Sequence, residues 1–304
     1  MKPLLIVNPA SASGAMRERW AEAERTLRSE GFAYEAVFTE RRGHASEIAR
    51  DALQRGFDLL VAVGGDGTLH EVVNGMLADG KVINPHATLG LIPGGTGSDF
   101  ARSAALPLAM LAAARSLARS AGTRPIDVAE AIWRAAGKEE RRYFVNVAGM
   151  GFDAEVIERT ERRGKWGRGT LPYLAALAAT ALRYRNKDVT LRVDGKQVRG
   201  RMHSVIICNG RYFGGGMCIA PNARFDDGQL DVIVLGDFGP LATLWHAPKV
   251  YRGAHLALSR VSEYHGRTVT VESEQRMLIE ADGELLGAGP ATFRILPAAL
   301  QFTA

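Results

Sequence analysis

The sequence predicts an α/β protein with two parts: a Rossmann-like parallel α/β domain over residues 1–123, then a mainly antiparallel β-sandwich domain over residues 124–304. Before residue 123, short β-type runs alternate with amphipathic helical patterns, as in a parallel sheet covered by helices on both faces. After Asp127, many short alternating runs follow, which is typical of an antiparallel sheet. Gly122 and Pro125 interrupt regular structure at the junction.

In the first part, each expected strand is followed by an expected helix. Gly31 and Gly56 stand where the first two helices would end. Two strand-to-helix turns rich in glycine lie at the carboxyl ends of strands, so they should flank one crevice. In chain order, the expected elements are a strand at 4–10, a helix at 16–31, a strand at 34–40, a helix at 43–56, a strand at 58–65 and a strand-turn-helix unit at 88–104.

The second part is expected to consist of short strands with a few helices. Asp194-Gly195 and Asp282-Gly283 stand where tight hairpins would turn. Helical patterns interrupt the strands near 165–185 and 239–258. The expected strands cover 126–133, 142–149, 189–195, 202–210, 230–236, 268–273 and 276–283.

Charge and composition limit the classes of partner that the protein is expected to bind. The net charge is +5 and the pI is near 9.3, but most basic residues alternate with acidic ones along helical segments, which indicates solvated helix faces and no nucleic-acid partner. The N-terminal apolar run is too short for a secretory segment, so we expect a cytoplasmic protein. The sequence leaves open whether the protein forms a homodimer.

The segment from Glu158 to Gly169, "ERTERRGKWGRG", is an exception because its basic residues cluster around a tryptophan. The apolar run after it lacks the roughly 20 apolar residues that a spanning helix needs. Arg159 to Arg168 could therefore rest on anionic lipid headgroups, giving a peripheral contact at the inner face of the membrane. The alternative is a loop followed by a buried helix.

The stretch "VAVGGDGTLHEVVNG", Val61 to Gly75, runs from a strand through glycines into a helix. Gly64, Gly65 and Gly67 allow positive φ and leave room for a ligand. Thr68 and Glu71 have the spacing of a capping box, which predicts a helix that begins at Leu69. Its free N–H groups would form an anion site. The alternative is a tight connection whose glycines serve geometry alone.

Asp66 is unusual in such a loop because a carboxylate repels phosphate. A magnesium ion between the two would remove the repulsion, or the carboxylate could accept a proton from a hydroxyl group. The sequence contains no P-loop lysine motif and no dinucleotide fingerprint. The histidines lack zinc-type spacing, and His70 is interpreted as a polar surface or supporting group.

The motifs together resemble the diacylglycerol kinase catalytic family, which includes bacterial lipid kinases and the sphingosine and ceramide kinases. The resemblance rests first on "GGDGTLHEVVNG" followed by "PGGTGSDFAR", and the first of these alone also resembles NAD kinases and phosphofructokinases. It extends over nearly the whole chain through "NPASASG", "NVAGMGFDAEV", "APNARFDDGQLDV" and "ADGE".

The resemblance implies phosphoryl transfer from ATP to a lipid hydroxyl, with the nucleotide between the domains. The first turn departs from the family pattern Asn-Pro-x-Ser-Gly, because four residues separate Pro9 from Gly14; this leaves open which amide there meets a phosphate. By resemblance, the residues that contact ATP are Asn8, Pro9, Ser11, Gly14, Thr39, Gly65, Asp66, Gly67, Thr68, Leu69, His70, Glu71, Gly95 and Thr96.

The resemblance also implies a structural Mg²⁺ held by the Asp227 side chain and by main-chain oxygens of Arg224 and Gln229. Hard oxygen ligands around a glycine turn suit that ion, although the residues alone indicate only a turn. Glu284 is preferred as the general base, with Asp66 organising Mg²⁺ and ATP, and the reverse assignment stays open.

The expected function is therefore an ATP-dependent lipid kinase that acts most simply on diacylglycerol. Phosphatidylglycerol, a monoacylglycerol or a sphingoid base are alternative acceptors. A soluble-substrate kinase of the NAD-kinase type is a second hypothesis, and a regulatory binding protein without catalysis is a third. The joint presence of Asp66, Asp227 and Glu284 argues against the third.

Overall fold

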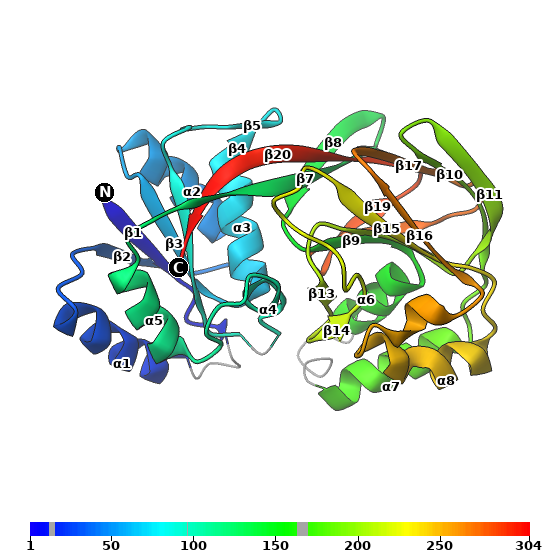
Figure 1. Ribbon diagram of the computed structural model, residues 1–304, viewed down its shortest axis with the longest axis horizontal. Coiled ribbons are helices and arrows are strands. Elements are labelled where there is room, and N and C mark those ends of the chain that lie inside the picture. The colour runs from blue at the N-terminus through cyan, green and yellow to red at the C-terminus, as the bar shows by residue number, and fades with distance from the viewer. Residues whose placement is uncertain (12–15, 96, 163–169) are drawn as a thin grey trace.

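The computed structural model describes residues 1–11, 16–95, 97–162 and 170–304, and it confirms the expected class of fold (Figure 1). The first part is built on a parallel sheet with the strand order β2-β1-β3-β6. The carboxyl ends of these strands meet at one edge of the sheet. The strands are β1 (Pro3–Val7), β2 (Glu35–Phe38), β3 (Leu59–Gly64) and β6 (Thr88–Pro93).

Helices cover both faces of this sheet, as expected. Because side chains alternate along a strand, Leu4 and Ile6 of β1 pack against α2 and α3, whereas Leu5 and Val7 pack against α1 and α5. The helices are α1 (Met16–Ser29), α2 (His44–Gln54), α3 (Asp66–Met76), α4 (Asp99–Ser103) and α5 (Met110–Arg119). The short strands β4 (Leu77–Ala78) and β5 (Lys81–Val82) follow α3.

The second part is a sandwich of two mainly antiparallel sheets around an apolar core. One sheet holds β11 (Lys196–Met202), β10 (Lys187–Val193), β17 (Thr268–Glu272), β20 (Ala291–Thr303), β7 (Arg124–Ala135) and β8 (Lys138–Phe144). The other holds β16 (Val261–Gly266), β15 (Leu230–Leu235), β12 (Ser204–Cys208), β9 (Val147–Gly151), β18 (Leu278–Ala281) and β19 (Glu284–Ala288).

The two predicted hairpins are confirmed. Asp194 and Gly195 join β10 to β11, and Asp282 and Gly283 join β18 to β19. Both residues of each turn have positive φ, 46° and 85° in the first and 48° and 82° in the second. This is the backbone of the type I′ turn, which the Asp-Gly pairs predict.

The long strands β7 and β20 run through both parts (Figure 1). β20 pairs with β17 in the sandwich and, through Gln301–Thr303, parallel to β6 in the first part. β20 is not among the strands predicted from the sequence, because Pro297 interrupts its alternating apolar pattern. The pairing of β20 with β7 shifts at this point.

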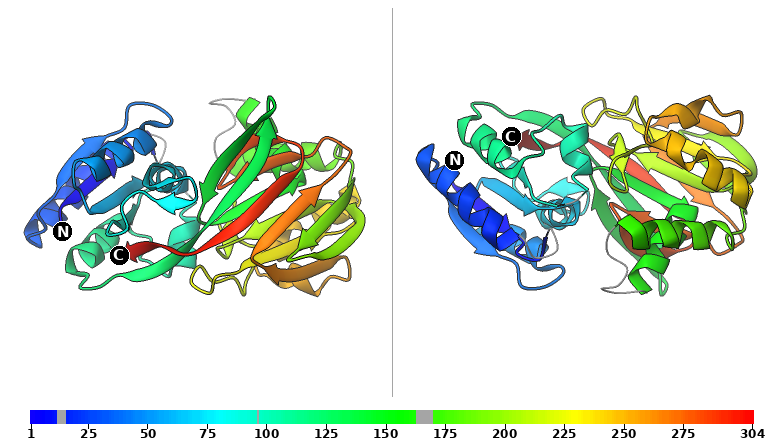
Figure 2. Two further views of the ribbon diagram at one scale, coloured as in Figure 1. Left: turned by 90° about the horizontal axis from the view of Figure 1, so that it is seen from above. Right: turned by 90° about the horizontal axis from the view of Figure 1, so that it is seen from below.

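Three helices and a short 3₁₀ helix lie on the outer side of the second sheet. Viewed from below, α7 and α8 form the lower surface of the second part (Figure 2). No helix among the described residues is long and apolar enough to cross a membrane. These helices are α6 (Phe152–Arg162), α7 (Thr170–Ala181), α8 (Pro240–Val250) and η3 (Ala254–Ala257), and the small hairpin of β13 (Tyr212–Phe213) and β14 (Met217–Cys218) lies nearby.

Candidate active site

The described residues expected to contact ATP gather at the carboxyl edge of the parallel sheet. The N–H of Asn8, just after β1, donates to the Val63 carbonyl at 3.0 Å, and its side-chain amide donates to Thr68 Oγ1 at 3.0 Å. The N–H of Thr39, after β2, donates to Val7 at 2.9 Å. Pro9 and Ser11 follow Asn8 at the same edge, whereas Gly14 and Thr96 lie outside the described residues.

The two glycine-rich loops touch each other directly. A Cβ built on Gly95 would lie 2.5 Å from the Cα of Gly65, and the N–H of Gly94 donates to the Gly64 carbonyl at 2.7 Å. The expectation of positive φ is wrong, since Gly64, Gly65 and Gly67 all lie outside that region. The glycines at 65 and 95 are required because two backbones approach closely.

The predicted start of α3 is also corrected. The helix begins at Asp66 instead of Leu69, with Gly65 at the cap position and no capping side chain among the described residues. Thr68 does not form the predicted box, because it lies inside the first turn of α3 and not at the cap position; its Oγ1 accepts the Asn8 amide. The first turn of α3 nevertheless opens at the carboxyl edge of the sheet, where its free N–H groups favour an anion.

Glu71, the other half of the predicted capping box, caps a different helix. Its carboxylate accepts the N–H groups of Gly43 at 2.8 Å and Ala45 at 3.1 Å, at the start of α2. The two helices contact each other closely at Gly75. A Cβ added there would lie only 2.3 Å from the Ser46 carbonyl oxygen. Glu71 therefore fixes the position of α3 against α2.

Asp66 and Asp99 link the two parts of the protein. The Asp66 carboxylate accepts the N–H groups of Asp99 at 3.2 Å and Phe100 at 3.1 Å. Asp99 in turn accepts those of Gly215 at 2.8 Å and Gly216 at 2.7 Å, in the second part. Burial raises the pKa of Asp66, and burial together with the charge of Asp66 raises the pKa of Asp99 to about 6.

A polar cleft lies between the two parts and is rich in carboxylates. Of the carboxylates in this cleft, only Asp66 was predicted from the sequence, although Asp99, Asp153 and Asp282 lie within the motifs of the family and Glu280 lies just before one. Asp99 belongs to "PGGTGSDFAR", and Asp153 to "NVAGMGFDAEV". The acidic residues that line the cleft are Asp66, Asp99, Asp153, Glu280 and Asp282.

Asp153 and Glu280 lie close together in this cleft. A Cβ on Gly149 would lie 1.6 Å from Asp153 Oδ2 and 3.2 Å from Glu280 Oε1, so glycine is needed there. Asp153 Oδ1 accepts the Ser204 hydroxyl at 2.7 Å, while the buried Oδ2 has no hydrogen-bond partner among the described residues. Burial raises the pKa of both carboxyl groups, and the charge of Asp153 raises the pKa of Glu280 further.

His70 lies inside the protein, so of its two predicted interpretations the surface group is wrong and the supporting group agrees with the structure. Its side chain is 1% exposed, with Nδ1 3.2 Å from Asp282 Oδ2 and Nε2 3.5 Å from Glu284 Oε2. Burial alone would lower its pKa, but hydrogen bonds and charges from Asp282 and Glu284 raise it to about 9. His70 is therefore a cation that holds the first part against the β18–β19 hairpin.

Glu284 is held on the other side of this histidine. Its side chain is 19% exposed, and Oε1 lies 3.5 Å from Arg42 Nη2. Burial alone would raise its pKa, but the hydrogen bond to His70 and the charges of His70 and Arg42 lower it to about 2. Glu284 is therefore a weak base in this environment.

We expect the free energy of unfolding to fall as pH rises from about 6.5 to about 9, by up to about 3 kcal/mol, because of His70. The folded pKa near 9 lies above the ordinary value of 6.5, so this stabilisation is fully present below pH 6.5 and lost as pH rises through 9. Urea unfolding at several pH values measures it. His70→Gln should flatten the slope, and the exposed His86→Gln should not; equal slopes in all three proteins would contradict the assignment.

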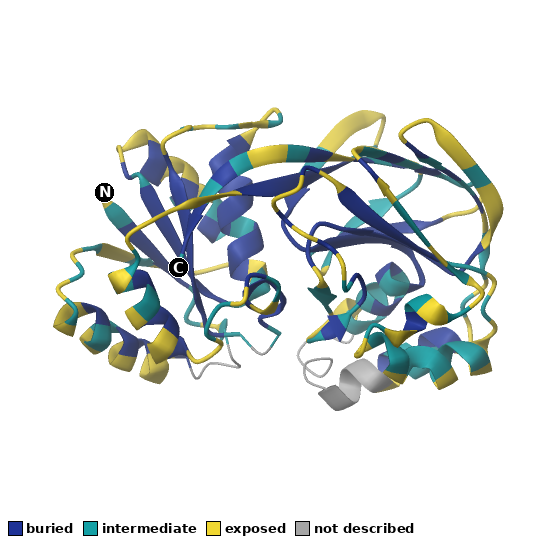
Figure 3. Ribbon diagram, viewed as in Figure 1, coloured by how far each residue is buried: buried dark blue, intermediate teal, exposed yellow. Residues whose placement is uncertain are grey.

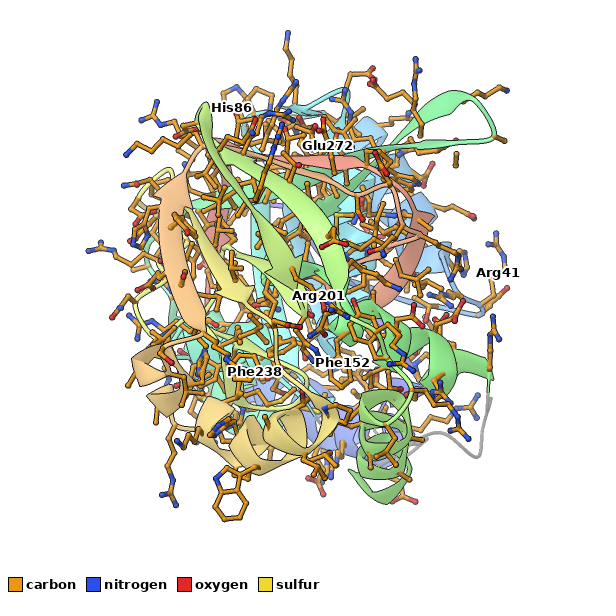
Figure 4. The ribbon with its side chains drawn as sticks, turned by 90° about the vertical axis from the view of Figure 1, so that its right-hand side faces the viewer. Arg41, His86, Phe152, Arg201, Phe238 and Glu272 are labelled. Atoms are coloured by element: carbon orange, nitrogen blue, oxygen red, sulfur yellow. The ribbon has the colours of Figure 1, made fainter. Side chains whose placement is uncertain are left out.

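An apolar cavity adjoins the cleft on the side of α7 and α8. In Figure 4, Phe152 and Phe238 are labelled above these helices, and both line the cavity. The cavity and the cleft share Asp153 and Phe213 in their walls. Other apolar lining residues include Val156, Leu177, Ile206, Met217 and Val250.

Comparison with known proteins assigns the chain to a family. Residues 2–131 match the diacylglycerol kinase catalytic domain, and residues 146–304 match the YegS C-terminal NAD kinase β-sandwich-like domain. A diacylglycerol kinase from Mycobacterium tuberculosis is 31% identical over 99% of this chain and 94% of its own. This chain belongs to the diacylglycerol kinase family.

Other members of the diacylglycerol kinase family are similar over most of the chain. The diacylglycerol kinase of Bacillus subtilis is 28% identical over 95% of this chain and 91% of its own, and a YegS-like lipid kinase assigned in Pseudomonas putida is 31% identical over 94% and 90%. A crystal structure from Bacillus anthracis, of a candidate diacylglycerol kinase, has a TM-score of 0.78 at 27% identity and covers 99% of this chain and 94% of its own.

The diacylglycerol kinase resemblance placed Mg²⁺ at the turn from Arg224 to Gln229. Asp227 is exposed there, and its Oδ1 accepts the Gln229 N–H at 3.0 Å. Gly228 is tied to Asp127 Oδ2 at 2.7 Å, and the Arg224 side chain pairs with Asp226 at 3.0 Å. A carboxylate and main-chain oxygens on an exposed turn fit a hydrated Mg²⁺.

Proposed function

We propose that this protein transfers the γ-phosphoryl group of ATP to a lipid hydroxyl, most simply that of diacylglycerol, giving phosphatidic acid. The observation that carries the proposal is the junction of the acid-lined cleft with the apolar cavity, which share Asp153 and Phe213. A lipid whose chain occupies the cavity would present its polar end in the cleft. The names of the relatives support the same acceptor.

The nucleotide would lie along the carboxyl edge of the parallel sheet. The first turn of α3 offers free N–H groups to its phosphates, and the contact between Gly65 and Gly95 keeps the edge free of side chains at that point. Magnesium bound with the triphosphate would offset the negative charge of the phosphates and of Asp66. At the turn, Asp227 with main-chain oxygens of Arg224 and Gln229 would hold a second, structural ion.

Asp66 fits the role of general base better than Glu284, which reverses the assignment preferred from the sequence. Asp66 lines the cleft and has a raised pKa, whereas the pKa of Glu284 is lowered to about 2 by its contact with His70. A base with a higher pKa takes a hydroxyl proton more readily. The proton would pass to Asp66 as the lipid oxygen bonds to the γ-phosphorus and ADP leaves.

An acceptor with long acyl chains resides in a bilayer, so the protein would work in the cytoplasm as a peripheral protein at the inner face of the membrane. Its catalysis would depend mainly on positioning and charge neutralisation, as in other phosphoryl transfers. The carboxylates from both parts of the chain that meet in the cleft are suited to this positioning.

The direct test is incubation with labelled ATP and separate mixed micelles of diacylglycerol, monoacylglycerol, phosphatidylglycerol or a sphingoid base, with NAD as the water-soluble alternative. We expect label in a lipid product, strongest with diacylglycerol. Label in NAD alone would overturn the lipid-kinase proposal in favour of a soluble-substrate kinase, and no transfer to any acceptor would favour a binding protein.

A further inference from the structure

Helix α8 has apolar side chains on two opposite faces. Its inner face lines the cavity through the apolar Ala247 and Val250, beside Thr243 and His246. Its outer face carries Leu241 and Trp245, each 79% exposed, the highest values among the large hydrophobic residues described as exposed. No residue of α8 is buried, and the helix shows only exposed and intermediate colours (Figure 3). An apolar helix face without a protein partner indicates contact with something outside the chain.

A groove between α7 and α8 connects this surface with the cavity. The groove is lined by Ala178, Leu244 and Tyr251, among others. Leu177, Met217 and Ala247 line both the groove and the cavity. A hydrocarbon chain in the groove would therefore lie against the same apolar side chains that line the cavity.

The surroundings of the groove are basic. Arg252 lies in its wall beside Lys249, and Arg183 and Arg185 follow α7 as exposed residues. The nearest acidic side chain to α8 in sequence, Asp237, is paired with Arg201 at 3.6 Å. Apolar side chains bordered by cations that form no ion pair within the described part of the chain match the surface of an anionic bilayer.

We propose that this α7–α8 face, defined by Leu182, Leu241, Trp245 and Tyr251 with the basic residues Arg183, Arg185, Lys249 and Arg252, docks on an anionic lipid bilayer. Leu241 and Trp245 enter the acyl-chain region, and the basic side chains contact the headgroups. The purpose of the contact rests on the proposed lipid-kinase function: the acceptor passes from the bilayer into the groove without crossing water.

The basic segment at 158–169, which the sequence predicts as a docking surface, receives less support from those of its residues that the structure describes. Arg159 Nε donates to the Thr180 hydroxyl at 2.9 Å, so this side chain is held against α7. Arg162 pairs with Glu158 at 3.1 Å. The other basic residues of that segment, at 163–169, lie outside the described residues.

Co-sedimentation with vesicles tests the surface without ATP. The whole protein is mixed with vesicles of phosphatidylcholine alone or with phosphatidylglycerol added. Leu241→Ser combined with Trp245→Ser should weaken binding at least about tenfold, since two exposed apolar side chains lose their insertion. The control combines Leu108→Ser with Leu111→Ser, which are 44% and 39% exposed in the first part, and should bind as the unmodified protein does.

Three outcomes would overturn the proposal: unchanged binding of the Leu241/Trp245 variant, equal weakening in the control, or weakening only after Arg159→Gln with Arg162→Gln. A fourth is a change of oligomeric state in the Leu241/Trp245 variant without loss of vesicle binding, which would make the face a contact between two copies. Thermal unfolding verifies that each variant is folded.

Tryptophan fluorescence reports how deeply the side chain of Trp245 enters the bilayer. Emission of the unmodified protein should shift to the blue on anionic vesicles and be quenched by lipids brominated on their acyl chains. The measurement is made in a Trp166→Phe background, because Trp166 lies outside the described residues; in that background Trp245→Phe should remove most of the response, since Trp20 and Trp133 are 6% and 8% exposed. An unchanged response in that variant would contradict insertion of Trp245.

Kinase activity on a dissolved and on a vesicle-bound acceptor distinguishes the docking proposal from the proposed kinase function. The Leu241/Trp245 variant should keep its turnover with a short-chain diacylglycerol dissolved in water and lose it with diacylglycerol in vesicles. If the unmodified protein phosphorylates no lipid, the kinase proposal fails while vesicle binding still decides the docking surface. If both acceptors are lost equally, docking is not the role of these residues.

Discussion

Asp66→Asn is expected to lower kcat by at least about 10³-fold while the protein remains folded. The substitution preserves the shape of the side chain but removes its negative charge and its ability to take a proton. The carboxylate lines the cleft, and it accepts two N–H groups at the start of α4. Turnover of labelled ATP with diacylglycerol micelles measures the loss, and circular dichroism and thermal unfolding report on the fold.

Asp58→Asn is the matched control, because Asp58 precedes the amino end of β3 and also accepts a backbone N–H, that of Lys2. This variant should keep its turnover. Glu284→Gln distinguishes the two candidate bases: it should cost less activity than Asp66→Asn. If Asp66→Asn turns over normally, the site is wrong, and if Glu284→Gln is the more damaging change, the roles of the two acids are reversed.

Asp282→Asn is expected to lower the free energy of unfolding by about 3 kcal/mol or more. The carboxylate accepts the N–H groups of Val145, Asn146 and Val147 at 2.9 to 3.1 Å. It also faces the buried cation of His70, and its side chain is 1% exposed. An amide in its place would bring N–H groups against these donors. Urea unfolding with a constant m-value measures the change.

Asp194→Asn is the control for this variant. Asp194 also precedes a glycine at positive φ and accepts N–H groups, those of Arg267 and Thr268, but it is exposed. Asparagine tolerates positive φ at both sites, so the comparison isolates burial and charge. We expect a small effect at position 194. Equal effects at both positions would show that the hairpin backbone, and not the contact with His70, determines the stability.

The sequence was sufficient for those features that depend on neighbouring residues. Alternating apolar patterns and helix-ending glycines predicted the parallel sheet, and the Asp-Gly pairs predicted both tight hairpins. The gathering of Asn8, Thr39 and Gly65 at one edge also follows locally, because each residue comes just after a parallel strand.

Features that depend on contacts between residues far apart in the chain could not be predicted from the local sequence. Glu71 has the local spacing of a capping box, yet its carboxylate finds the free N–H groups of α2 instead. The sequence left His70 as either a surface or a supporting group, because its partner Asp282 lies in the β18–β19 hairpin, more than 200 residues further along the chain. Strand β20 was not predicted because Pro297 interrupts its pattern; the proline is accommodated where the pairing with β7 shifts.

The position of β20 has a consequence for folding. Leu300 and Phe302 belong to the apolar core of the first part together with Leu4 and Ile6, which lie far from them along the chain. Contacts so distant along the chain form late and slow the search for the native state. The first part therefore cannot complete its core before β20 is in place, and removing residues 300–303 should impair the first part rather than the sandwich.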